Sequence, residues 1–163
     1  MQKSEQLEPG YELVFTVCEF YDGPRQGVAN FRGNPHFYNC IFDENRQDYS
    51  NLFELTPVSQ EVFDLAMEDW AIWERWESAY RKGEVTLESH GSLPQDRARH
   101  GELKTILDGL LRTDRETCFI RVGTFAVEST PELPIGAMRP LQVKWDGPTP
   151  NHERYGFNSI RRP

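Results

Sequence analysis

Residues 28–42 of the chain, VANFRGNPHFYNCIF, decide the fold. Two runs of mainly apolar and aromatic residues stand on either side of Gly33-Asn34, a dipeptide that is typical of a tight hairpin turn. Pro35 follows at the start of the second run, where the loss of a backbone donor disturbs a sheet least. The stretch therefore predicts two antiparallel strands joined by a short turn at Gly33-Asn34.

Further strands are expected on both sides of this hairpin. Residues 11–20, YELVFTVCEF, place apolar side chains at every second position, which is the period of a half-buried strand. A polar loop at residues 43–50 leads into a short strand around residues 52–55. Strand character returns at residues 118–127 and again at residues 141–145. The chain therefore predicts an N-terminal meander and additional C-terminal strands.

Two helices are predicted between these groups of strands. Ser59 is a favourable N-cap, and the segment after it has apolar residues at three- and four-residue spacing. These residues are Val62, Phe63, Ala66, Met67, Trp70, Trp73, Trp76 and Tyr80. Ser92 and Gln95 have the spacing of a capping box, and the second helix should end near Arg112.

This order of elements, strands followed by two helices and then strands again, predicts the α+β class. We expect an antiparallel sheet of about five or six strands, the N-terminal meander plus the C-terminal strands, packed by the two central helices. With 163 residues the chain has the length of one domain. We assign residues 1–145 to this domain and expect residues 146–163 to form an extended or loosely docked C-terminal tail.

The chain is acidic, with 26 Asp and Glu against 18 Lys and Arg and a formal net charge of −8. This charge disfavours a duplex nucleic acid, because Lys and Arg contacts to phosphates supply most of the non-specific affinity. A basic protein partner fits it better, through electrostatic steering. No stretch is apolar enough to span a membrane, and residues 1–10 have no signal-peptide pattern. We therefore expect no membrane association and a cytoplasmic location.

Neither a disulfide framework nor a metal site is expected. Cys18, Cys40 and Cys118 are odd in number and widely spaced, which is typical of reduced thiols. His36 and Cys40 share one face of a predicted strand but lie about 13 Å apart along it, too far to bind one zinc ion. Cys118 alternates in phase with apolar residues of its strand, which predicts a small buried hydrophobe. The sequence predicts no cofactor.

Residues 21–27, YDGPRQG, share the pattern aromatic-Asp-Gly-Pro with residues 145–148, WDGP. Gly accepts positive φ, Pro presets φ, and Asp can accept a hydrogen bond from the backbone two residues on, so each copy is a good turn. Because both copies follow a predicted strand and share nothing else, we interpret the pattern mainly as turn chemistry. The alternative is that Asp22 and Arg25 are held on a rigid loop for recognition.

In an antiparallel meander, the loop at residues 43–50 returns to the end of the sheet that carries residues 21–26. The polar residues of these two loops that are candidates for a binding site are Asp22, Arg25, Gln26, Asp43, Glu44, Arg46 and Asp48. His36 belongs to the opposite end and cannot pair with Asp22. The carboxylates could act as acid and base in a hydrolysis or hold a hard cation. The other interpretation is a set of solvated turn charges with the arginines as counter-ions.

Three functions stay open from the sequence. Without a nucleophile motif, a phosphate loop or a metal spacing, we favour a non-catalytic intracellular interaction or accessory module, one that could neutralise a basic partner. The second hypothesis is a small hydrolase or transferase that uses the rim of loops 21–26 and 43–50. The third is a small-ligand binder with an aromatic pocket along Trp70, Trp73 and Trp76, although an amphipathic helix on a sheet needs that row as core.

Overall fold

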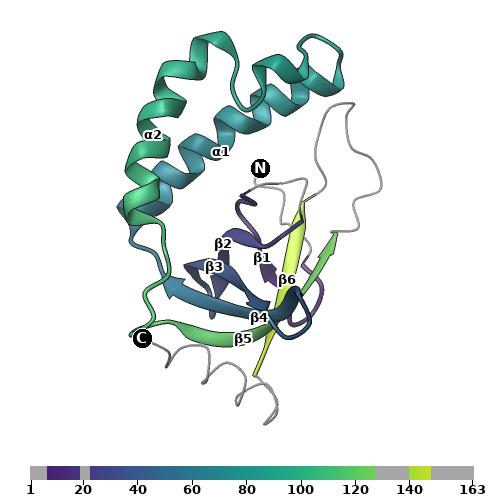
Figure 1. The fold of residues 1–163 in the computed structure, drawn as a ribbon, viewed down its shortest axis with the longest axis vertical. Helices are drawn as coiled ribbons and strands as arrows, with labels where there is room; N and C mark the ends of the chain where they lie inside the picture. The colour runs from purple at the N-terminus through teal and green to yellow at the C-terminus, as the bar shows by residue number, and fades with distance from the viewer. Residues whose placement is uncertain (1–6, 19–22, 128–139, 148–163) are drawn as a thin grey trace.

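The computed structural model describes residues 7–18, 23–127 and 140–147. These residues form one six-stranded antiparallel sheet and two α-helices, which confirms the predicted α+β class (Figure 1). The strands are β1 (Glu12–Leu13), β2 (Gln26–Phe31), β3 (Asn34–Asp43), β4 (Asp48–Pro57), β5 (Phe119–Val127) and β6 (Leu141–Asp146). The helices are α1 (Gln60–Arg81) and α2 (Arg97–Leu110), with the short 3-10 turns η2 (Leu87–Ser89) and η3 (Pro94–Asp96) between them.

The sheet has the strand order β1-β6-β5-β4-β3-β2 and curves until its two edges approach each other. Each strand from β2 to β5 pairs antiparallel with the next strand along the chain, and both helices are inserted between β4 and β5. β1 pairs with β6, while isolated bridges join Val14 to Ala29 and Cys18 to Gln26. The segment around β1 therefore contacts both β6 and β2. The result is a nearly closed barrel, an arrangement that leaves few unpaired strand edges.

Aromatic rings fill the barrel. Tyr38, Phe53, Phe125 and Trp145 pack ring against ring, with centroids 5.4 to 6.3 Å apart. Gly123 leaves room for them, because a Cβ atom there would lie 2.6 Å from the Trp145 ring and 2.8 Å from the Phe53 ring. These rings and the buried aliphatic residues around them form one hydrophobic core inside the barrel.

The two helices bury a second core against the outside of the barrel. Val28 of β2 has no exposed surface and packs with Ala66 and Ile72 of α1 and with Leu103 and Leu107 of α2. Figure 1 shows α1 and α2 lying side by side along one side of the barrel. The helices therefore cover one part of the outer face, while the aromatic residues fill the inside.

The first turn of α1 begins as predicted. Ser59 is the N-cap, and its hydroxyl oxygen accepts a hydrogen bond from the backbone N–H of Val62 at 3.3 Å. Phe63, in the same part of the helix, packs edge-on against Phe15 with ring centroids 4.9 Å apart. This contact joins α1 to the segment that follows β1.

The start of α2 differs from the prediction. Ser92 and Gln95 do not form a capping box; the chain passes through η3, and α2 begins at Arg97 with Asp96 as an N-cap that makes no side-chain cap bond. The carboxylate of Asp96 is instead engaged by Arg75 of α1 through two hydrogen bonds of 3.0 Å. An interhelical ion pair has replaced the local cap, which sequence spacing alone does not reveal.

The tryptophan row divides into two parts. Trp76 has no exposed surface, stacks on Tyr80 at 5.2 Å and donates its indole N–H to the hydroxyl of Ser89 at 3.1 Å. It therefore anchors the segment around η2 to α1. Trp70 and Trp73 stack on each other at 4.9 Å and stay partly exposed. The expectation that the whole row is core was too broad, because Ile72 and Ala66 of α1 pack with Val28 of the barrel, whereas Trp70 and Trp73 stay partly exposed.

The hairpin of residues 28–42 forms, but its turn lies one residue earlier than predicted. Phe31 pairs with Asn34, so Arg32 and Gly33 are the two turn residues, with φ values of 53° and 77°. Two consecutive positive φ values are the signature of a type I′ turn, which matches the twist of the flanking strands. β3 accordingly begins at Asn34 with Pro35 as its second residue.

The first strand is much shorter than residues 11–20. β1 spans two residues, because the backbone N–H groups of both Phe15 and Thr16 donate to the oxygen of Val28, at 2.8 and 3.1 Å. The hydroxyl of Thr16 then accepts from the N–H of Val28 at 2.9 Å. A side chain thus replaces a backbone partner, and the regular ladder stops there.

At the other end of the chain, β6 runs to Asp146, one residue beyond the boundary of 145 that we assigned to the domain. The tail expected at residues 146–163 lies outside the described residues from position 148 onward. Within the described ranges, no helix has the length and apolar character needed to cross a membrane.

Candidate functional site

The two loops predicted to share a rim meet through an arginine and a tyrosine. Arg25, just before β2, places its guanidinium carbon 3.9 Å from the centre of the Tyr49 ring at the start of β4. Gln26 donates its side-chain N–H to the Asn39 side chain on β3 at 2.7 Å and is exposed. Asp22, the remaining candidate on the first loop, lies outside the described residues. We call the described candidates, together with Phe42 and Tyr49, the hairpin rim.

The acidic residues of the β3–β4 loop shape the loop itself. Asp43 Oδ1 accepts hydrogen bonds from the backbone N–H groups of Asn45 at 2.9 Å and Arg46 at 3.3 Å. Asp48 Oδ1 accepts from the backbone N–H of Tyr49 at 2.8 Å. These are the local turn bonds typical of Asp in loops. The carboxylates of Asp43 and Asp48 therefore hold the hairpin end in a defined conformation.

Two exposed rings stand at the base of this loop. Phe42 and Tyr49 are paired across β3 and β4, with 44% and 41% of their surface exposed. Their centroids are 5.2 Å apart at an interplanar angle of 82°, the edge-to-face geometry that aromatic pairs favour. Sequence reasoning missed this pair. The pair could have been predicted from the aromatic residue on each side of the polar loop, because residues that flank a hairpin loop lie opposite each other on the two strands.

Arg25 and Asp48 also act on a common buried thiol. Cys40 is buried and donates its S–H to the backbone oxygen of Ser50 at 3.0 Å. Burial raises the pKa of Cys40 to about 11, with Arg25 lowering it and Asp48 raising it. The thiol is therefore protonated at neutral pH and is no nucleophile.

The described acidic and basic side chains of the hairpin rim do not form ion pairs with one another. Over residues 23–127, no ion pair connects Asp43, Glu44 or Asp48 with Arg25 or Arg46. Glu44 and Arg46 are exposed. The arginines therefore do not act as direct counter-ions of these acids.

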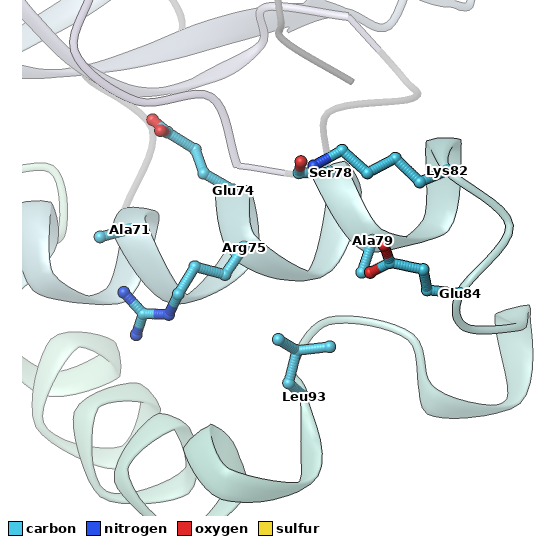
Figure 2. Close-up of a pocket in the computed structure, with 8 residues that line it drawn as sticks. All are labelled: Ala71, Glu74, Arg75, Ser78, Ala79, Lys82, Glu84 and Leu93. Carbon is cyan, nitrogen blue, oxygen red and sulfur yellow. The ribbon is translucent and has the colours of Figure 1, made fainter. Parts of the chain in front are cut away.

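An open groove of about 490 Å³ runs along α1, well away from the rim in sequence (Figure 2). Its lining residues are Ala71, Glu74, Arg75, Ser78, Ala79, Lys82, Glu84 and Leu93. Figure 2 shows Arg75 and Leu93 pointing into the space between α1 and the segment that precedes α2. The lining carries charges of both signs and no tryptophan, so it differs from the aromatic pocket considered from the sequence.

A buried glutamate stands out on β4. Glu54 is 6% exposed, and its Oε2 has no hydrogen-bond partner among the described residues; the Arg115 side chain lies 3.8 Å away. Burial raises the pKa of Glu54, while Arg115 lowers it. Burial and the charge of Glu54 also raise the pKa of Cys118.

Cys118 itself is half-buried and not the fully buried hydrophobe expected. The sequence placed Cys118 and every second residue after it on the buried face of this strand. The opposite set faces the barrel, and it consists of Phe119, Arg121, Gly123 and Phe125. Across the described parts of the chain, no group of three or more His, Cys, Asp or Glu side chains is placed to hold a metal ion.

Comparison with known proteins adds no assignment to this geometry. No protein-family model matches the chain, no curated protein is similar to it, and no solved structure matches it.

Proposed function

We propose that this protein is a non-catalytic interaction module that binds a basic protein partner through the hairpin rim. The observation that carries the proposal is the stacking of Arg25 on the exposed ring of Tyr49, 3.9 Å from its centre, beside exposed Phe42. Tyr and Arg are enriched at the positions that dominate binding energy in protein interfaces. Here both are held in place before a partner arrives, which lowers the entropic cost of binding.

Charge determines the kind of partner. Asp43 directly follows Phe42, Asp48 directly precedes Tyr49 and Glu44 lies in the loop between them, and the chain as a whole has a formal charge of −8. Carboxylates around an aromatic centre form a polar boundary that attracts Lys and Arg side chains and steers a basic protein toward the site. A cytoplasmic location belongs to the same proposal, since the three cysteines are free thiols.

The chemistry of the rim favours binding over catalysis. The carboxylates of Asp43 and Asp48 are occupied by loop backbone groups, and the neighbouring thiol of Cys40 has a raised pKa. A hydrolase would need a carboxylate free to move a proton within a cleft. The groove along α1 lies elsewhere and is open, so it offers the rim no enclosed space.

Affinity capture with matched variants tests this proposal. The wild-type chain, the double variant Phe42→Ser with Tyr49→Ser, and the control Ile106→Ser would each be used as bait in lysate of the source cells, with quantitative mass spectrometry. Ile106 is an exposed apolar residue on α2, with 39% of its surface accessible. We expect a basic protein that the wild type and the control recover and the rim variant loses. Equal recovery of every captured protein by all three baits would contradict the proposal.

A further inference from the structure

A second arginine–aromatic cluster lies at the opposite end of β2. Arg25 directly precedes this strand, whereas Arg32 directly follows it in the β2–β3 turn. The guanidinium carbon of Arg32 is 4.9 Å from the Phe31 ring centre and 5.7 Å from that of Phe119. Arg121 of β5 lies over the same two rings, at 5.3 and 5.7 Å. Two permanent positive charges therefore share one aromatic platform.

The rings of the platform pack against their neighbours. Phe31 is 5% exposed, and its ring packs at 5.4 Å against Phe119 and edge-on at 5.3 Å against His36. The His36 ring donates through Nδ1 to the backbone oxygen of Asn34 at 2.8 Å, which fixes the imidazole. Phe119 has 36% of its surface exposed, so one part of the platform faces solvent.

Arg32 is held in an unfavourable backbone conformation. Its φ of 53° lies in the left-handed region, which costs a non-glycine residue about 1 kcal/mol. Asn or Asp is the usual choice before Gly in such a turn. Glu12 holds the turn, since its carboxylate accepts from the backbone N–H groups of Arg32 at 3.2 Å and Gly33 at 2.8 Å. Residues kept in strained conformations cluster at binding sites.

Arg121 is equally unusual for its position. It occupies the phase of β5 that faces the barrel, shared with Gly123 and Phe125, where an apolar residue is the rule. One of its terminal N–H groups donates to the backbone oxygen of Ile120 at 2.8 Å. The other donors of the guanidinium have no partner within the described ranges.

Neither Arg32 nor Arg121 forms an ion pair with a residue that the structure describes. The ion pairs found there involve other cations, and both oxygens of Glu12 accept from the turn backbone. We propose that Arg32 and Arg121 form a binding site for the phosphate monoester group of a small molecule. A pair of guanidinium groups matches the charge of a phosphate dianion and its tetrahedral oxygens, and the exposed face of Phe119 can contact the carbon substituent.

The charge of the whole protein limits the size of the ligand. A net charge of −8 repels a long polyanion, whose many phosphates would extend beyond two arginines. One phosphate group needs only the local pair. The site therefore fits a small phosphorylated molecule, and single-stranded nucleic acid is the alternative that a binding test has to separate.

NMR titration with phenyl phosphate tests the site, with inorganic phosphate, benzoate and a short oligodeoxythymidine as parallel probes. We expect saturable shifts of the Arg32, Gly33 and Phe119 amides with phenyl phosphate, weaker binding of inorganic phosphate and the weakest binding of benzoate. Arg32→Asn removes the guanidinium but keeps the type I′ turn, so it should fold with equal or higher melting temperature and bind phenyl phosphate about tenfold more weakly or worse. Arg121→Gln should have a similar effect on binding.

Arg112→Gln is the matched control, because Arg112 is exposed and no contact of its side chain is described. It should bind phenyl phosphate like the wild type. Three results would overturn the site: absent saturation with phenyl phosphate, an equal loss in Arg112→Gln and Arg32→Asn, or benzoate binding as tightly as phenyl phosphate. Tighter binding of the oligonucleotide than of phenyl phosphate would overturn the assignment to a small ligand.

Discussion

The guanidinium carbon of Arg25 lies 3.9 Å from the centre of the Tyr49 ring and joins the loop before β2 to the base of the β3–β4 hairpin. The backbone supports the same contact, since the N–H of Cys40 donates to the oxygen of Arg25 at 2.7 Å. The YDGPRQG loop thus has two roles. Its glycine and proline turn the chain, and its arginine completes an exposed aromatic surface.

The turn role of this loop can be tested at Gly23. Its φ is 89°, in the left-handed region, and a Cβ atom there would have no atom within 4 Å. Gly23→Ala should therefore destabilise the protein by about 1–2 kcal/mol through backbone conformation alone. Gly147, the corresponding residue of the WDGP copy, is equally open, but its φ is outside that region. Urea unfolding should show a much smaller effect for Gly147→Ala, and equal losses would show that strain at Gly23 is not the cause.

The divided tryptophan row predicts unequal effects of two substitutions. Trp76→Ala removes a fully buried ring and the donor to Ser89, so it should cost about 3–5 kcal/mol of unfolding free energy. Trp73→Ala removes a partly exposed ring that stacks on Trp70, so the loss should be clearly smaller. Thermal unfolding followed by circular dichroism compares the two variants. A larger loss in Trp73→Ala would mean that the row packs differently.

Glu54 predicts a pH-dependent stability. Its pKa in the folded protein is above the ordinary value of 4.5, so the native state binds the proton more tightly than the unfolded chain does. Ionisation of Glu54 therefore costs stability as pH rises above that value. Glu54→Gln should be more stable than the wild type at neutral pH, and its advantage should shrink as pH falls toward and below 4.5.

The measurement is denaturant unfolding at several pH values, with Glu44→Gln as the control, since Glu44 is an exposed glutamate of the hairpin loop. A stability difference between wild type and Glu54→Gln that does not change with pH would contradict a raised pKa of Glu54. The raised pKa of Glu54 would also be contradicted if the stability of Glu44→Gln depended on pH in the same way as that of Glu54→Gln.

The sequence predicts those elements whose causes are local. The period of apolar residues and the Ser59 cap define α1, and the Gly33 turn with its two flanking runs defines the β2–β3 hairpin. The turn is displaced by one residue because Arg32 adopts positive φ, a conformation that residue type alone would not suggest. Local rules therefore predict the correct element, and they fail where one residue adopts a backbone conformation that its type disfavours.

Features that depend on distant parts of the chain could not be predicted in this way. Closure of the barrel needs the bridges from Val14 and Cys18 to β2, which are set by long-range pairing. Asp96 pairs with Arg75 on another helix, which overrides the local capping pattern. Arg121 is a charged residue on the face of β5 that also carries Phe119 and Phe125. It is recognised as unusual only once the structure shows that this face points toward the barrel.

The rim was foreseen in part. Placing the loops 21–26 and 43–50 at one end of the sheet followed from strand order, and Arg25 does contact the base of the second loop. The rings of Phe42 and Tyr49 were not foreseen, because aromatic residues in strands are normally assigned to the core. Exposed rings are identified by burial, which a single sequence does not show.

Site-specific photo-crosslinking in the source cells tests the interaction proposal most directly. A benzophenone amino acid would replace Tyr49 at the rim and, in a separate control, Leu110, an exposed residue of α2. We predict one dominant crosslinked partner from position 49, basic in composition, that is absent from position 110 and is lost when Asp43 and Asp48 are changed to Asn. Crosslinks from position 110 with none from position 49 would contradict the account, because the contact surface would then lie on the helices.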